Sequence, residues 1–187
     1  KIFCESPIHK EMARKYSDLG DSNVEVSGYV KMDSFYTDTK TDFPGLWKMA
    51  NADNRASVKK IIYAPHYSIG KGFAGFGNFD KIYREILAFA KDHKDTTSWV
   101  IRPHPMLRAE CVLEGLFQDE EEFDDYLRQW EDLPNASVSQ GGMYIDLFRT
   151  SDAMILDSVS FLAEYLYAHK PMLFLTRDSQ TFNDFGH

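Results

Sequence analysis

Polar side chains that can bind an anion stand directly after three short apolar segments of this chain. They lie in residues 65–68 (PHYS), 102–105 (RPHP) and 157–160 (DSVS). Imidazole, guanidinium and hydroxyl groups all donate hydrogen bonds to phosphate oxygens. If the apolar segments are parallel strands, the three groups meet beyond the carboxyl ends of one sheet, where open α/β sheets bind their ligands. The pattern therefore predicts one composite site.

His104 stands between two prolines and follows Arg102. The proline rings restrict the backbone, so the imidazole is presented from a stiff turn, and His104 is the candidate catalytic residue. Arg102 can bind a phosphate with two parallel hydrogen bonds, or its side chain can be directed into a salt bridge instead. His66, which follows Pro65 at the end of the first segment, is a further candidate phosphate ligand.

The third group begins at Asp157 and leads into a predicted helix. Ser158 and Ser160 stand where this helix starts, and its backbone N–H groups together with the hydroxyls form an anion site suited to a diphosphate. The alternative is that the two serines only cap the helix. Glu164 lies one turn further on and can accept hydrogen bonds from ribose hydroxyls. All four residues are therefore candidates for binding a nucleotide.

A glycine-rich segment from Gly70 to Gly77 follows the first of these groups. Its G-x-G-x-x-G-x-G order matches the dinucleotide fingerprint only superficially, because no acidic residue ends a second strand about 20 residues further on. Phe73 and Phe76 are also bulky for that motif. We interpret the segment as a mobile loop over the site, and the alternative is that its glycines serve turns.

Alternating strands and helices position these groups. Hydrophobic periodicity predicts strands over 2–4, 24–26, 59–64, 98–102, 136–138, 153–156 and 171–175, and helices over 7–19, 79–93, 119–130, 144–149 and 160–168. Residues 37–57 are predicted to form a loop with one short helix around 46–50. Helical crossovers between strands imply a parallel sheet, and strands that are apolar throughout are covered on both faces. The predicted fold is α/β, with a doubly wound parallel sheet.

The composition, with 43% hydrophobic and 27% charged residues, is typical of a soluble globular protein. The net charge of −8 is concentrated in an acidic run over 119–125, which favours a solvated helix start over a metal site. No basic face for nucleic acid is visible. Cys4 and Cys111 lack metal-ligand spacing, and His9, His66 and His104 do not form a metal pattern either, so we expect no metal.

Two isolated cysteines suggest a reducing compartment, and no apolar stretch approaches the length of a membrane span. We therefore expect a cytoplasmic location, with at most peripheral association with the inner face of the membrane. The chain begins at Lys1 rather than Met and stops abruptly at His187. We accordingly expect a fragment of a longer two-domain protein, in which residues 1–35 are linker and edge elements and residues 36–187 form a nucleotide-donor-binding, Rossmann-like domain.

An ordered set of short motifs extends over roughly residues 24–178. They are GYVKMD at 28–33, IYAP at 62–65, RPHP at 102–105, DLFRTSD at 146–152, DSVS at 157–160 and KP at 170–171. The set resembles the G-x-P-R-x-D, Y-A-P-T, K/R-P-H-P, D-L…S-D, D-Y-S-S and K-P motifs of the CDP-glycerol glycerophosphotransferases. These are the teichoic-acid polymerase and primase-like enzymes of cell-wall and capsule synthesis.

The resemblance implies the C-terminal, donor-binding half of a GT-B fold. It implies that His104 and Arg102 contact the donor phosphates, that Ser158 and Ser160 bind phosphate at the helix start, and that Glu164 faces the ribose or nucleobase. The partners would be CDP-glycerol or a similar nucleotide-linked donor and a polymeric or lipid-linked acceptor, with no cofactor. The second active-site histidine of the family lies in the N-terminal domain, so this chain is expected to bind its donor without turnover.

Three departures from the family pattern leave other functions open. His66 replaces the Thr of Y-A-P-T, Val159 replaces a Ser, and Val30-Lys31 replaces Pro-Arg. The donor is therefore CDP-glycerol, CDP-ribitol or a nucleotide-sugar. A UDP-sugar-dependent GT-B glycosyltransferase or a UDP-GlcNAc 2-epimerase-like enzyme is one alternative function, because such proteins have a similar D-S-G-G-x-x-E-E layout. A non-catalytic interaction domain is the other.

Overall fold

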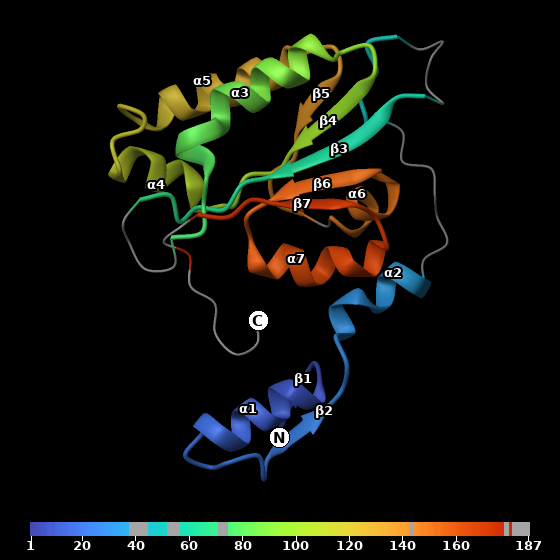
Figure 1. Ribbon diagram of the computed structural model, residues 1–187, viewed down its shortest axis with the longest axis vertical. Helices are drawn as coiled ribbons and strands as arrows, with labels where there is room; N and C mark the ends of the chain where they lie inside the picture. The colour runs from blue at the N-terminus through green and yellow to red at the C-terminus, as the bar shows by residue number, and fades with distance from the viewer. Residues whose placement is uncertain (38–44, 52–56, 71–74, 143, 178–179, 181–187) are drawn as a thin grey trace. The chain divides into compact units, whose positions relative to one another are not determined.

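The computed structural model describes residues 1–37, 45–51, 57–70, 75–142, 144–177 and 180. The chain divides into two compact units, Lys1–Thr39 with Phe182–His187, and Lys40–Thr181. Figure 1 shows both units with their helices and strands labelled. The larger unit carries all of the candidate site residues. The expectation that the chain belongs to a longer two-domain protein stays a prediction.

The smaller unit is a strand–helix–strand arrangement. β1 (Ile2–Cys4) pairs in parallel with β2 (Val24–Val26), and α1 (Pro7–Tyr16) connects them. The Ser6 hydroxyl caps α1 by accepting the backbone N–H of His9, and the helix ends three residues earlier than predicted. Two short elements that were not predicted follow, η1 (Val30–Met32) and α2 (Asp33–Thr37).

The larger unit contains a five-stranded sheet in the order β5-β4-β3-β6-β7, with every pair parallel. Its strands are β3 (Lys59–Ala64), β4 (Thr97–Ile101), β5 (Ala136–Val138), β6 (Ala153–Leu156) and β7 (Met172–Phe174). Along the chain, β4 and then β5 are added on one side of β3, and β6 and then β7 are added on its other side. This confirms the predicted doubly wound α/β fold, and it puts the topological switch point between β3 and β6.

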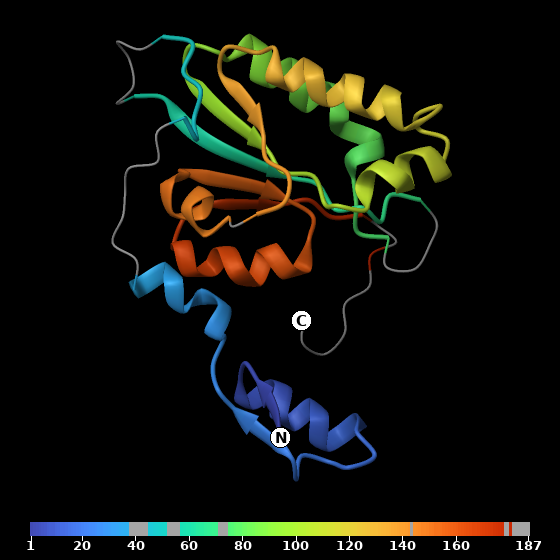
Figure 2. The same cartoon turned by 180° about the vertical axis from the view of Figure 1, so that it is seen from behind.

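Helices cover both faces of this sheet. They are α3 (Phe79–Asp92), α4 (Leu107–Leu113), α5 (Glu120–Glu131), α6 (Ile145–Thr150) and α7 (Val159–Tyr165), which continues into η3 (Leu166–Ala168). The first three lie on one face and α6 and α7 on the other, as both views show (Figures 1 and 2). In this unit the bounds of these strands and helices agree with the predictions to within one or two residues when η3 is counted with α7, except that α4 was not predicted.

The predicted helix around residues 46–50 is wrong. Residues 45–51 form turns and bends without a helix. The Trp47 indole N–H donates to the Thr150 hydroxyl at 2.8 Å, and the Lys48 carbonyl accepts the Ser98 hydroxyl at 2.6 Å. Because tertiary hydrogen bonds hold this segment, its backbone does not close helical turns.

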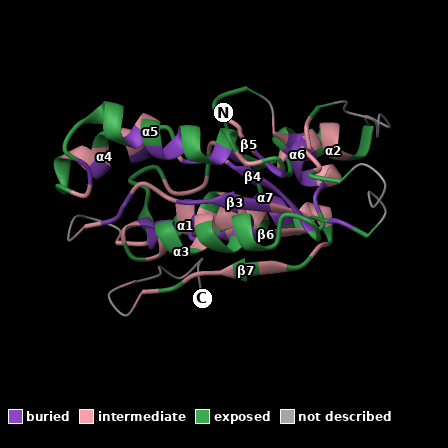
Figure 3. Cartoon of the chain, turned by 90° about the horizontal axis from the view of Figure 1, so that it is seen from above, coloured by how far each residue is buried: buried purple, intermediate pink, exposed green. Residues whose placement is uncertain are grey.

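An aromatic core lies between the sheet and the layer formed by α3, α4 and α5. Trp99, Trp130, Phe79 and Phe123 are each at most 1% exposed. β4 is buried at all five positions, as Figure 3 also shows for the middle of the sheet. At the start of α5, Asp119 caps the helix by accepting the backbone N–H of Glu122 at 2.9 Å. The acidic run is therefore a solvated helix start, as predicted.

No helix in the described part of the chain is both long and apolar enough to cross a membrane.

Candidate functional site

A buried carboxylate joins the elements that meet at the switch point. Asp157 follows β6 and is fully buried. It accepts the backbone N–H of His66 and that of Asn78, both at 2.6 Å. Burial raises the pKa of this carboxyl to about 6, while the two hydrogen bonds act in the opposite direction. The structure therefore places Asp157 behind the site, where it fixes the end of β3 and the start of α3.

His66 is half-buried beside the end of β3. Its Nδ1 lies 2.8 Å from the Ser68 hydroxyl and accepts the Ser68 backbone N–H at 3.3 Å. Its ring centroid is 4.4 Å from that of Tyr67 and 5.2 Å from that of His104. Burial, and secondly the proximity of His104, lower the pKa of His66 to about 4. The imidazole is therefore neutral at neutral pH.

His104 is placed directly beside this group, as its position after β4 predicted. Its backbone N–H donates to the Pro65 carbonyl at 3.1 Å, and its Nδ1 accepts the Met106 N–H at 3.2 Å. The Tyr67 ring lies 4.6 Å from its ring, centroid to centroid. Burial lowers the pKa of His104 as well. Two neutral imidazoles thus lie side by side at the carboxyl ends of β3 and β4.

Arg102 is directed toward the segment that follows β5. Its guanidinium donates to the Ser139 hydroxyl at 2.7 Å and to the Gly142 carbonyl at 3.2 Å, and it lies 5.1 Å from the centroid of the Tyr144 ring. Its hydrogen-bond partners within the described residues are all neutral. The guanidinium therefore keeps a positive charge at this edge that no described carboxylate neutralises, and the alternative of a salt bridge is not observed.

Glu164 is buried, with 2% of its surface exposed, and it accepts a hydrogen bond from the Tyr144 hydroxyl. The Tyr144 ring also packs against Phe148 and Phe161. Burial and the neighbouring Glu164 raise the pKa of Tyr144. Tyr144 therefore links Arg102 to Glu164. The sequence indicated Tyr144 only as a helix start, because nothing in its local pattern shows that it contacts both charged residues.

The two serines at the start of α7 do not cap the helix through their side chains. Ser158 occupies the N-cap position with extended backbone, but its hydroxyl makes no capping hydrogen bond. Ser158 is 8% exposed, whereas Ser160 is exposed. Neither hydroxyl has a hydrogen-bond partner in the described part of the chain. The alternative that these serines serve only as caps is therefore wrong for their side chains.

The glycine-rich segment is described only at its two ends, since residues 71–74, and with them Gly72, lie outside the described residues. The predicted loop over the site therefore stays a prediction. Gly75 has a φ of 49°, which is a conformation that glycine adopts without strain. At Gly77 an added Cβ would lie 2.8 Å from the His66 carbonyl oxygen. Because Gly77 has no side chain, the backbone that leads into α3 can approach the His66 backbone closely.

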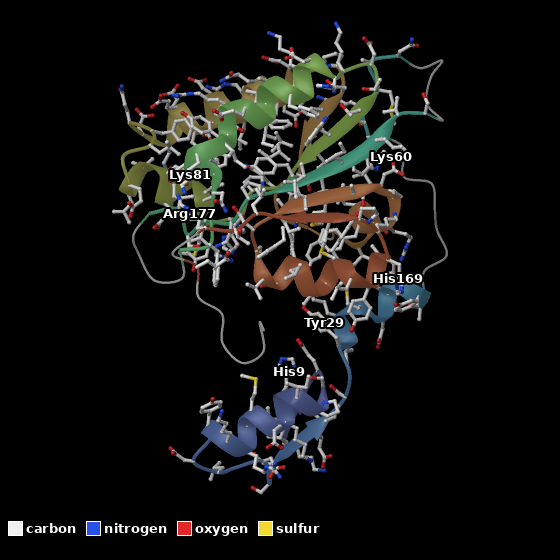
Figure 4. The ribbon with its side chains drawn as sticks, viewed as in Figure 1. His9, Tyr29, Lys60, Lys81, His169 and Arg177 are labelled. Atoms are coloured by element: carbon white, nitrogen blue, oxygen red, sulfur yellow. The ribbon has the colours of Figure 1, made fainter. Side chains whose placement is uncertain are left out.

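A second cation lies at the same end of the sheet. Arg177, which follows β7, donates to both carboxylate oxygens of Asp80 at 2.6 and 2.5 Å, and this pair neutralises its charge. Figure 4 shows Arg177 beside Lys81 at this end and Lys60 and His169 at the opposite end. Within the described ranges, no three His, Cys, Asp or Glu side chains lie together as a metal site would require.

An all-parallel, doubly wound sheet with polar groups at its switch point defines the class of this protein: a Rossmann-like domain of the GT-B type. The family model described as CDP-Glycerol:Poly(glycerophosphate) glycerophosphotransferase matches residues 2–185, which is nearly the whole chain. The chain belongs to this family. No curated protein matches the chain.

Proposed function

We propose that this chain is the donor-binding domain of a transferase that moves glycerol phosphate, or a related polyol phosphate, from a CDP-linked donor to a cell-wall or capsular polymer. The observation that carries the proposal is the family match over residues 2–185, combined with two neutral imidazoles at the switch point of the sheet. We place this activity in the cytoplasm, with peripheral attachment to the membrane at most.

The proposed reaction is a phosphoryl transfer. An acceptor hydroxyl oxygen forms a bond to the phosphorus that carries glycerol, and the bond from that phosphorus to the bridging oxygen breaks. The hydroxyl proton passes to a base of the acceptor-binding half of the protein, the position that the family resemblance gives to a second histidine. CMP leaves with the electron pair, so negative charge develops on the phosphate oxygens. Hydrogen-bond donors fixed in advance around the diphosphate stabilise that charge more than water does. His104 is proposed as the catalytic donor, because its half-buried ring lies beyond the carboxyl end of β4 and beside His66.

The remaining candidates divide into two roles. His66 and the hydroxyls of Ser158 and Ser160 are proposed to bind the diphosphate. Asp157 was predicted to contact the donor, but both of its oxygens accept backbone N–H groups, and we now propose that it positions His66. A buried carboxylate facing a diphosphate directly would repel it.

Arg102 is proposed to contact the donor phosphates, and Glu164 to serve the nucleoside end of the donor. The Arg102 guanidinium provides the positive charge. A cation–π contact with the Tyr144 ring, whose centroid lies 5.1 Å away, holds the guanidinium in place. Glu164 lies behind the Tyr144 hydroxyl, so we propose that it acts on the ribose or base side through Tyr144.

Calorimetric titration of the chain with CDP-glycerol, CDP and UDP-GlcNAc tests this proposal. We expect both CDP compounds to bind and UDP-GlcNAc to bind more weakly. In the protein complete with its acceptor-binding half, His104→Ala should lower turnover of CDP-glycerol by ~100-fold or more. His93→Ala, on the surface at the end of α3, is the matched control and should leave turnover unchanged. Lack of binding of either CDP compound would contradict the proposal, and conversion of UDP-GlcNAc would support a sugar-nucleotide enzyme instead.

A further inference from the structure

The hydroxyl of Ser68 lies at the centre of a buried set of hydrogen bonds behind His66. Ser68 is 6% exposed. Its oxygen lies 2.8 Å from the Nδ1 of His66, and it accepts the backbone N–H of Phe76 at 3.0 Å and that of Gly77 at 3.4 Å. The same residue therefore contacts the imidazole and the chain that returns from the glycine-rich segment.

The number of available protons decides the direction of these bonds. A serine hydroxyl has one hydrogen to donate and two lone pairs that accept. The Phe76 N–H donates to the hydroxyl oxygen, and the Gly77 N–H is shared between this oxygen at 3.4 Å and the Ser68 carbonyl oxygen at 3.0 Å. The hydroxyl hydrogen is therefore directed at the Nδ1 of His66. The Ser68 backbone N–H also donates to this Nδ1 at 3.3 Å. Because two donors point at Nδ1, that nitrogen carries no proton, and the ring proton of His66 is on Nε2.

The same assignment follows for the neighbouring imidazole. The Met106 backbone N–H donates to the Nδ1 of His104 at 3.2 Å, so the neutral ring carries its proton on Nε2. The Nε2 atoms of His66 and His104 have no hydrogen-bond partner in the part of the chain that the structure describes. The two rings, 5.2 Å apart, thus offer two Nε2–H donors at one place on the sheet edge.

We propose that Ser68 is a positioning residue, which holds His66 as a neutral Nε2–H donor to a phosphate of the nucleotide-linked donor. The phosphate as ligand rests on the proposed function; the orienting of His66 by Ser68 does not. Two imidazolium rings at this distance would repel one another, whereas two neutral rings can bind an anion together. The titratable groups that face His66 from neighbouring elements are Asp157, which follows β6, and His104, which follows β4. The Tyr67 ring packs against the His66 ring.

Ring-nitrogen NMR of the chain labelled with ¹⁵N-histidine tests the proposal directly, because the two neutral tautomers give different nitrogen shifts. We expect His66, assigned by the loss of its signals in His66→Gln, to show protonated Nε2 and bare Nδ1 at neutral pH. Ser68→Ala removes the 2.8 Å hydroxyl contact and leaves only the longer 3.3 Å backbone N–H at Nδ1, so the preference for the Nε2-protonated tautomer should fall measurably. CDP-glycerol binding should weaken by ~10-fold, the effect of one lost hydrogen bond. Ser68→Thr, which keeps the hydroxyl, should restore the single tautomer.

Ser22→Ala removes an exposed hydroxyl in the smaller unit and is the control that should change neither readout. A proton on Nδ1 of His66 in the unmodified chain overturns the inference, and that measurement requires no variant to fold. An unchanged tautomer in folded Ser68→Ala also overturns it. If the tautomers behave as expected but folded wild-type chain binds neither CDP nor CDP-glycerol, the proposed function fails and phosphate is not the ligand of His66.

Discussion

Asp157 accepts the backbone N–H of His66 at 2.6 Å across 91 residues of sequence. This hydrogen bond connects the end of β6 to the end of β3, the two strands that flank the switch point. The second oxygen of Asp157 accepts the N–H of Asn78 at the start of α3. One buried carboxylate thus holds three chain segments around the imidazole of His66.

Asp157→Asn should lower both stability and donor affinity. The amide nitrogen of Asn cannot accept an N–H group, so one buried backbone donor loses its partner, at a cost of about 1–3 kcal/mol in the free energy of unfolding. Urea denaturation measures this change, and calorimetry with CDP-glycerol measures the affinity.

Asp152→Asn is the matched control for that experiment. Asp152 accepts the backbone N–H of Lys60 at 2.8 Å at the opposite, exposed end of the same two strands. Solvent can replace this hydrogen bond, so the loss of stability should be smaller and donor affinity unchanged. Equal effects of the two substitutions would show that Asp157 has no particular role in positioning the site.

Gly77→Ala should disturb the backbone beside His66. The new Cβ would lie 2.8 Å from the His66 carbonyl oxygen and 3.1 Å from Ile69 Cγ2, so backbone must shift. We expect a loss of about 1–3 kcal/mol in unfolding free energy, together with weaker donor binding.

Gly70→Ala, at the other end of the same segment, provides the comparison. The three atoms nearest to its Cβ all belong to the carboxylate end of Glu114, a flexible exposed side chain that can move aside. The change in unfolding free energy should stay below about 1 kcal/mol. A Gly70→Ala variant as unstable as Gly77→Ala would refute the steric explanation.

The stability of the chain should depend on pH through His66. Its folded-state pKa of about 4 lies below the usual 6.5, so between these values the unfolded state binds the extra proton and the folded state does not. The contribution of His66 to the free energy of unfolding therefore falls as the pH falls from about 6.5 to 4. Asp157, with a folded-state pKa of about 6 against 3.8, acts in the opposite direction over nearly the same range.

Urea denaturation of wild type and His66→Gln from pH 7 to pH 4.5 isolates the histidine contribution. The difference in unfolding free energy, variant minus wild type, should rise as the pH falls, because the variant cannot lose stability through this imidazole. Ser22→Ala, which removes no titratable group, should follow the wild-type pH dependence. A difference that stays constant over this pH range would show that His66 titrates normally.

Lys170→Met should destabilise the end of α6. The Lys170 ammonium donates to the carbonyl of Phe148 at 3.2 Å and to those of Arg149 and Ser151 at 2.5 Å. These carbonyls lie at the carboxyl end of the helix, where a positive charge is favourable. Losing these hydrogen bonds should lower the free energy of unfolding, measured by urea denaturation, by about 1–3 kcal/mol. Lys91→Met, on the exposed face of α3, should change stability by less than about 0.5 kcal/mol, and an equal loss there would count against this capping role.

Local signals were sufficient to predict most of the elements. The apolar run that forms β3 ends at Pro65, and the acidic start of α5 follows its capping residue Asp119, so both bounds were predicted closely. α4 was missed because it has only seven residues, follows two prolines and has no side-chain cap. The tertiary hydrogen bonds of Trp47 and Ser98, which prevent a helix over residues 46–50, have no local signature either.

By itself the sequence determined the fold class and which residues stand at the carboxyl end of each strand, because periodicity and helix or strand signals are local properties. Only the tertiary structure decided which groups each side chain there contacts. It brought His66 beside His104, turned Asp157 inward onto backbone amides, and placed Tyr144 between Arg102 and Glu164. Those relationships depend on which strands become neighbours and how side chains pack between them, and contacts between residues far apart in the chain leave no pattern in the local sequence.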